Sequence, residues 1–283
     1  MGNAQPGGYY FAPPSHWPLV GSAALLLMAF GGVMLMNSVG GGGIVFGIGS
    51  AILVYMLFGW FGTVIRESQG GMYNKQVDTS FRWSMSWFIF SEVMFFAAFF
   101  GALYYARVYS VPWLGDIDNR ALWPDYKAAW PSAGPYMPPQ FSAMGAWGIP
   151  ALNTFLLLSS GITVTWAHWA LKAGNRQQLI LGLLATVVLG FTFLGFQIYE
   201  YVHAYQDLNL KLTTGIFGST FFMLTGFHGF HVTLGAVMLT VILFRAVAGH
   251  FTAENHFAFE AVAWYWHFVD VVWLLLFVFV YWV

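Results

Sequence analysis

Seven long apolar stretches dominate the chain, and short polar connections separate most of them. They lie near residues 17–37, 44–65, 83–106, 148–171, 178–203, 214–246 and 258–282. A helix needs about 20 apolar residues to cross a bilayer, and in lipid its backbone groups must be paired within the segment. No stretch alternates as a membrane β-strand would. The pattern predicts an all-α integral membrane protein with seven transmembrane helices.

The polar connection 66–82 is the natural place to divide the chain. We expect a single membrane domain over 1–283, with a two-helix part at 1–82 and a five-helix part at 83–283. The loop near 107–147 is rich in Pro, Trp and Tyr, which is typical of an ordered cap at the membrane surface. Gly43 and Gly47 form a GxxxG pattern, and Gly226, Gly229 and Gly235 line the sixth stretch, so close helix contacts are expected at both places.

The composition excludes several classes of protein. Hydrophobic residues make up 59% of the chain and charged residues 7%, against roughly 25% charged residues in soluble domains. The net charge is -1 without a block of one sign, so nucleic acid is not an expected partner. The chain has no cysteine, which excludes disulfides, thiolate metal sites and cysteine nucleophiles.

Positive charges predict the orientation in the membrane. Six fall on the side that also carries the N-terminus, and four fall on the other, mostly in the long loop where the rule is weaker. The N-terminus is therefore expected inside and the C-terminus outside. The first group is Arg66, Lys75, Arg82, Lys172, Arg176 and Arg245, and the second is Arg107, Arg120, Lys127 and Lys211.

Glu92 lies near the middle of the third stretch, where an ionisable group needs a reason. Desolvation penalises the carboxylate, so a neutral, hydrogen-bonded acid is favoured unless a cation is close. Two interpretations of Glu92 are equally supported: it is a group that transfers protons, or it is a protonated acid that is hydrogen-bonded to a neighbouring helix. Our preferred partner is His231.

His228 and His231 are three residues apart and share one face of the sixth stretch. A metal or heme site would need further ligands on facing helices, and His168, His203 and His267 follow no shared spacing with them. Hydrogen bonding between helices is the favoured interpretation. We therefore expect no metal site.

Two acid and imidazole pairs recur at the same spacing. His267 and Asp270 lie in the last stretch and, like His228, are predicted to be buried, with Asp270 pointing into the bundle or toward another polypeptide. Glu200 and His203 lie near the end of the fifth stretch, and ordinary hydration is the favoured interpretation.

Lipid-contacting residues are predicted at the inner membrane surface. Indole and guanidinium groups there can meet lipid head groups, although ordinary interfacial anchoring is the simpler interpretation of any one of them. The residues are Trp60, Arg66, Glu67, Arg245 and His250. The chain contains no Walker loop, no GxGxxG and no nucleophile motif, so no catalytic residue is assigned.

Several strings carry a more specific resemblance. They are HWPLVG at 16–21, VIRES at 64–68, FSEVMFF at 90–96, PALNTFLLLSSGITVTWAHWAL at 150–171, FGSTFFMLTGFHGFHVTLG at 217–235 and HFAFEAVAWYWHFVDVVW at 256–273. In this order they resemble subunit III of the aa3-type heme-copper cytochrome c oxidases. The long Pro and Trp loop looks more like the bacterial type.

The resemblance implies a subunit without metals of its own. Hemes and coppers would lie on other subunits, with subunit I as the main contact, subunit II in the same complex and cytochrome c as substrate of the complex. It also implies a cleft, filled with phospholipid, between helices one and two and the other five. Glu92 matches the family's buried, carbodiimide-sensitive glutamate, and the five residues of the inner surface match lipid-contacting positions.

The resulting hypothesis is a structural and regulatory subunit that stabilises the catalytic subunit and supports proton uptake. The expected location is a bacterial inner membrane, with a cytoplasmic N-terminus and a periplasmic C-terminus; the mitochondrial inner membrane is the alternative. Three other functions remain open: a proton-coupled transporter using Glu92 and Asp270, a bis-histidine cytochrome, and subunit III of a quinol oxidase.

Overall fold

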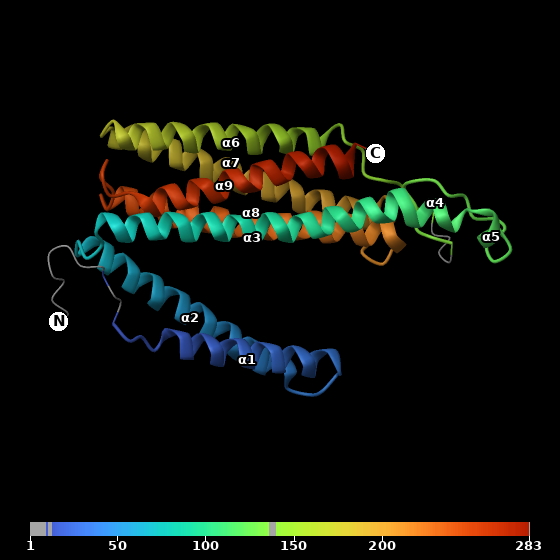
Figure 1. Cartoon of the computed structure of the whole chain (residues 1–283), viewed down its shortest axis with the longest axis horizontal. Helices are drawn as coiled ribbons and strands as arrows, with labels where there is room; N and C mark the ends of the chain where they lie inside the picture. The colour runs from blue at the N-terminus through green and yellow to red at the C-terminus, as the bar shows by residue number, and fades with distance from the viewer. Residues whose placement is uncertain (1–9, 11–12, 136–139, 283) are drawn as a thin grey trace. The chain divides into compact units, whose positions relative to one another are not determined.

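A computed structural model describes residues 10, 13–135 and 140–282, and the described residues are all helix, turn or loop (Figure 1). Within these described residues, seven helical segments are long and apolar enough to cross a membrane, which confirms the predicted number. The helices are α1 (Trp17–Met36), α2 (Gly42–Gln69), α3 (Lys75–Tyr105), α4 (Val111–Leu114), α5 (Ile117–Arg120), α6 (Ile149–Lys172), α7 (Arg176–Gln206), α8 (Gly215–Val247) and α9 (Phe257–Leu276), with the π-helical turns η1 (Ala106–Ser110) and η2 (Phe277–Tyr281).

Three of the helices, α2, α3 and α7, extend beyond the apolar stretches that predicted them. The connection expected at 66–82 is largely helical, because α2 continues to Gln69 and α3 begins at Lys75. Asn74 caps α3, since its side-chain oxygen accepts a hydrogen bond of 3.0 Å from the Val77 amide. The third span runs without a break through η1 and α4 to Leu114, and at 40 residues it is longer than the sixth span of 33. Hydropathy marks the apolar part of a helix and not the residue where its hydrogen bonding stops.

The chain forms two compact units, residues 1–81 and 82–283. In the first, α1 and α2 pack against each other as a hairpin. Gly42 and Gly49, seven residues apart on one face of α2, make the close approach, because a Cβ at either would come within 2.8 Å of the α1 backbone. The expected GxxxG pair is wrong here: Gly43 and Gly47 leave room for a Cβ and lie off the contact face.

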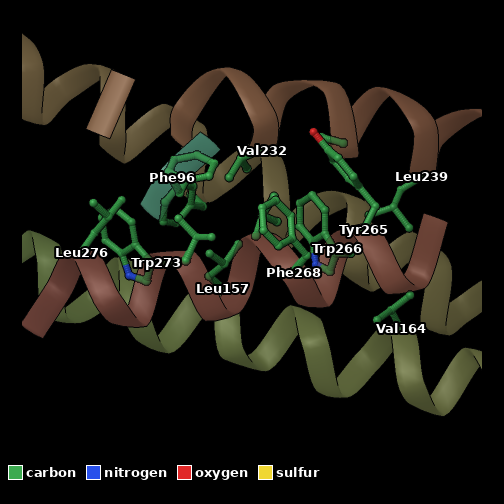
Figure 2. Close-up of a cluster of buried hydrophobic side chains, with 14 of the residues drawn as sticks. Phe96, Leu157, Val164, Val232, Leu239, Tyr265, Trp266, Phe268, Trp273 and Leu276 are labelled. Atoms are coloured by element: carbon green, nitrogen blue, oxygen red, sulfur yellow. The ribbon is translucent and has the colours of Figure 1, made fainter. Parts of the chain in front are cut away.

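The second unit has its core between α6, α7, α8 and α9, with α3 packed alongside (Figure 2). Trp266 and Trp273 of α9 are fully buried, and each indole N–H has a partner on α6. Trp266 donates to the Ser160 hydroxyl at 2.8 Å, and Trp273 donates to the Thr154 hydroxyl at 2.9 Å. The indoles thereby fix the register of α9 against α6, because a shift would leave buried donors unpaired.

Gly235 is where α8 meets Trp266. A Cβ there would come within 2.8 Å of the indole ring, so only glycine leaves room for the Trp266 side chain at this crossing. The close contact expected of the sixth stretch is therefore present at Gly235, but the same expectation is wrong for Gly229, where a Cβ would meet nothing within 4 Å, and for Gly226, where it would lie 3.5 Å from the Tyr201 hydroxyl.

The long loop begins after Leu114 and contains α5 and an irregular segment that covers the start of α8. The Trp130 ring packs on Phe217 with ring centroids 5.5 Å apart. The buried Ser132 accepts a backbone hydrogen bond of 3.1 Å from Phe217. These contacts are those of an ordered cap, while residues 136–139 of the loop lie outside the described residues.

Candidate functional site

A hydrogen bond between Glu92 of α3 and His231 of α8 forms the centre of the candidate site. The Glu92 Oε2 and His231 Nε2 atoms lie 2.9 Å apart, so the expected pairing is present. The His231 side chain is 9% exposed and that of Glu92 is 21% exposed. The hydrogen bond is therefore largely shielded from water, while part of the Glu92 side chain stays accessible.

The second nitrogen of His231 decides how the pair is protonated. Its Nδ1 lies 2.6 Å from the Phe227 carbonyl oxygen, and because a carbonyl only accepts, Nδ1 carries a proton. A single further proton then lies between Nε2 and the Glu92 carboxyl group. The pair is either a neutral acid donating to a neutral imidazole or a carboxylate accepting from an imidazolium. In both forms the two side chains share one proton.

Aromatic rings enclose this pair. Phe96 meets the His231 ring edge-on with centroids 5.1 Å apart, and Phe95 lies at 5.9 Å. The Tyr265 ring of α9 lies nearly parallel to the imidazole, with ring centroids 6.4 Å apart. The rings exclude water from the imidazole and so strengthen its bond to Glu92.

His228 serves a different contact from its neighbour. It is fully buried, and its Nε2 lies 3.1 Å from the Val269 carbonyl oxygen of α9, to which it donates. The two histidines of the motif thus join α8 to two different helices. They form no shared ligand pair, and the arrangement is the hydrogen bonding between helices that the sequence favours.

His267 and Asp270 lie on one face of α9, as expected, with Nδ1 and Oδ2 3.6 Å apart. Asp270 is buried and points into the bundle. The expectation that His267 is also buried is wrong, because 45% of its side chain is exposed. Its Nε2 lies 3.1 Å from the Thr165 hydroxyl of α6. Although the two residues are only three positions apart on α9, Asp270 lies inside the bundle and His267 lies at its surface.

The prediction that Glu200 and His203 are a hydrated pair near the end of the fifth span is wrong for Glu200. Glu200 is fully buried, beside Tyr281 of η2. His203 is partly exposed and bonds Asp207 at 2.6 Å instead of Glu200. Because α7 continues to Gln206, the acid lies deeper in the bundle than the apolar stretch indicates.

In the first unit, the predicted lipid-contacting residues gather at the C-terminal end of α2. Trp60 and Arg66 are exposed, and Arg66 donates to the Thr63 hydroxyl at 3.2 Å. Glu67 accepts a hydrogen bond of 2.9 Å from the Tyr73 hydroxyl in the turn before α3. Burial, together with this bond, raises the pKa of Tyr73 above its ordinary value.

In the second unit, Arg245 and His250 lie at the C-terminal end of α8. The Arg245 guanidinium stacks over the Phe251 ring, 4.7 Å from its centroid, and His250 is exposed. A cavity of about 290 Å³ opens beside them, lined by Arg176, Phe251 and Thr252 among others. A cationic, partly aromatic cavity at a helix end suits a lipid head group.

Sequence reasoning missed a further cluster of His168, His256 and Glu260, whose ligand atoms all lie within 4.8 Å of one another. Arg82 of α3 forms an ion pair with Glu260. The available signal is the spacing of HFAFE, which places His256 and Glu260 one helical turn apart. His168 is 88 residues earlier in the chain, and only the packing of α6 on α9 brings it close.

The fold and these sites define a polytopic helical membrane protein with paired polar groups inside its bundle. The cytochrome c oxidase subunit III family model matches residues 7–283. Proteins called cytochrome c oxidase subunit 3 are 44% identical in Marchantia polymorpha and 42% in Arabidopsis thaliana, each over all of this chain and 98% of the relative. That of Gadus morhua is 40% identical over 98% of both chains. The chain belongs to the cytochrome c oxidase subunit III family.

Proposed function

We propose that the chain works as the subunit III of a proton-pumping cytochrome c oxidase, without redox metals of its own. The observation that carries this proposal is the family match, which extends over almost the whole chain. Relatives that align over 98% of their length support a subunit of the same kind. The chain stabilises the catalytic subunit while electrons pass from cytochrome c to oxygen elsewhere in the complex.

Subunit I is the proposed main contact, with subunit II in the same complex. His267 supports a protein neighbour, since 45% of its side chain is exposed although it lies within a membrane span. Polar groups inside the membrane face protein or water and seldom the hydrocarbon. Hemes and coppers belong to those partner subunits.

The Glu92 and His231 pair is proposed to support proton uptake by the complex. Its single shared proton and the accessible part of Glu92 favour this role over a purely structural one. His228, which joins α8 to the Val269 carbonyl of α9, holds the surrounding helices together in this proposal.

Phospholipids are the proposed ligands of Trp60, Arg66, Glu67, Arg245 and His250. The exposed Arg66 and the aromatic-backed Arg245 supply the positive charge that a phosphate head group requires.

An energy-transducing inner membrane is the proposed location, with the N-terminus on the side from which protons are taken up. The excess of Lys and Arg in the connections on that side supports this orientation. We favour a bacterial plasma membrane because of the long Pro and Trp loop. The eukaryotic relatives make the mitochondrial inner membrane the alternative.

Copurification tests the proposed function. A tagged chain, extracted in mild detergent from its native membrane, is expected to bring with it heme-bearing subunits whose spectrum shows heme a. A colourless chain without partners, obtained under conditions that keep a known oxidase intact, would contradict the proposal.

A further inference from the structure

Three potential metal ligands converge where α6 ends and α9 begins. His168 is on the last turns of α6, His256 is the residue before α9, and Glu260 is on the first turn of α9. The His168 and His256 Nε2 atoms lie 3.5 Å and 3.7 Å from Glu260 Oε1. All three side chains are at most 20% exposed.

These separations fit a tetrahedral metal centre. Zinc bonds imidazole nitrogen at roughly 2.0–2.1 Å and carboxylate oxygen at about 2.0–2.2 Å, which places neighbouring ligand atoms about 3.3–3.6 Å apart. The two separations between an imidazole nitrogen and Glu260 Oε1 are already close to that length, and the three ligand atoms lie within 4.8 Å of one another. A small rotation of the imidazoles would bring their two Nε2 atoms to the same separation.

The protonation of His256 leaves a lone pair directed into the cluster. Its Nδ1 lies 3.1 Å from the Thr252 carbonyl oxygen, which can only accept, so Nδ1 carries the proton of the neutral ring. Its Nε2 is then unprotonated and makes no hydrogen bond among the described residues. A backbone carbonyl on the distal nitrogen is the usual way to orient a metal-binding histidine.

His168 also has a buried imidazole nitrogen that is directed at Glu260 without a hydrogen bond. Its Nε2 is also buried and without a hydrogen-bond partner in the described part of the chain. Two buried imidazole nitrogens that face the same carboxylate oxygen without a hydrogen bond to it are costly as they stand. A bound cation would satisfy both nitrogens at once.

Arg82 organises the carboxylate. It pairs with Oε2 of Glu260, so Oε1 is the oxygen that faces the imidazoles. The two imidazole nitrogens favour zinc over the oxygen-preferring magnesium or calcium.

We propose that His168, His256 and Glu260 form a site for a divalent transition metal, with Zn²⁺ as the preferred ion, that clamps the end of α6 to the start of α9. The three protein ligands leave a fourth position for water. The site lies away from the Glu92 and His231 pair, with which it shares no residue.

Zinc binding by the purified complex tests this site. The complex is treated with a chelator, equilibrated with Zn²⁺ alone, and assayed for zinc per complex by mass spectrometry. The wild type is expected to bind one equivalent that His256→Gln lacks, or binds at least tenfold more weakly. His203→Gln is the matched control, because it removes a histidine whose partner, Asp207, belongs to another end of the bundle.

X-ray absorption at the zinc edge of the wild type provides a readout that does not depend on variants. The expected spectrum shows that the one bound zinc ion has two imidazole ligands and oxygen ligands. Equal zinc content in the wild type and His256→Gln, or an edge spectrum without imidazole scattering, would overturn the proposal. The heme spectrum of the same preparation reports separately on assembly with the oxidase.

Discussion

Glu92 and His231 are 139 residues apart in the chain, yet their side chains meet at 2.9 Å between α3 and α8. The Phe227 carbonyl fixes the proton on the other side of the imidazole, at 2.6 Å. Because of this carbonyl, the two side chains share one further proton, whichever of them carries it.

Replacing Glu92 by Gln is expected to preserve assembly and to change proton handling. An amide can still donate to His231 Nε2, so the helices stay joined, but it neither releases nor accepts the shared proton. Proton uptake and the number of turnovers before inactivation should both fall in Glu92→Gln. The measurements are pH-indicator stopped flow and a long oxygen-consumption trace.

Ser91→Ala is the control for that experiment, because Ser91 is exposed and bonds only its own helix, at the Phe88 carbonyl. The serine variant should behave as wild type. Wild-type proton uptake and lifetime in Glu92→Gln would leave the pair with a structural role alone.

Gly235→Ala is expected to loosen the contact of α8 with α9. The added methyl group would meet Trp266 at 2.8 Å, and the indole is fixed by its bond to Ser160. Overpacking of this kind costs about 1–3 kcal/mol. The temperature at which the chain leaves the complex on a native gel should fall.

Gly229→Ala, on the same helix, supplies the comparison. A Cβ at Gly229 meets open space, so the change in stability should stay within about 1 kcal/mol. Equal dissociation temperatures for the two alanine variants would refute this account of the crossing.

The double variant Arg66→Ala with Arg245→Ala is expected to lose tightly held phospholipid. Each guanidinium lies at a helix end where head groups gather, and Arg245 is held in place by the Phe251 ring. Lipid retained per complex after detergent washing is measured by mass spectrometry. Arg120→Ala in the long loop should keep the full amount, and identical lipid content in all three proteins would count against the site.

Tyr73 provides a prediction of pH dependence. Burial and the hydrogen bond to Glu67 raise its pKa, so the folded protein holds this proton more tightly than the unfolded chain. The stability contributed by the proton is complete below a pH of about 10, where both states are protonated, and declines as the pH rises above 10.

The difference in tyrosinate absorbance between the wild type and Tyr73→Phe isolates this residue. The difference should appear at a pH clearly above about 10, while the oxidase spectrum is still intact. A midpoint at or below the value of free tyrosine would show that the contact with Glu67 does not persist in solution.

Much of the architecture follows from the sequence alone, for physical reasons. A bilayer admits only long apolar helices, so seven such stretches determined seven spans and the all-α class. The cost of an ionisable group in hydrocarbon was enough to single out Glu92, His231 and Asp270 within their apolar stretches. The ordered motifs from VIRES to HFVDVVW indicated the family that the match over 7–283 establishes.

Only the tertiary structure decided which polar groups meet, because spacing along one helix says nothing about the helix opposite. It separated His228 from His231, buried Glu200, turned His267 to the surface, and assigned the α1 contact to Gly42 and Gly49. It also brought His168 to Glu260 across the interface of α6 and α9. A local pattern fixes the face of a helix on which a side chain lies, but its partner depends on how the helices pack.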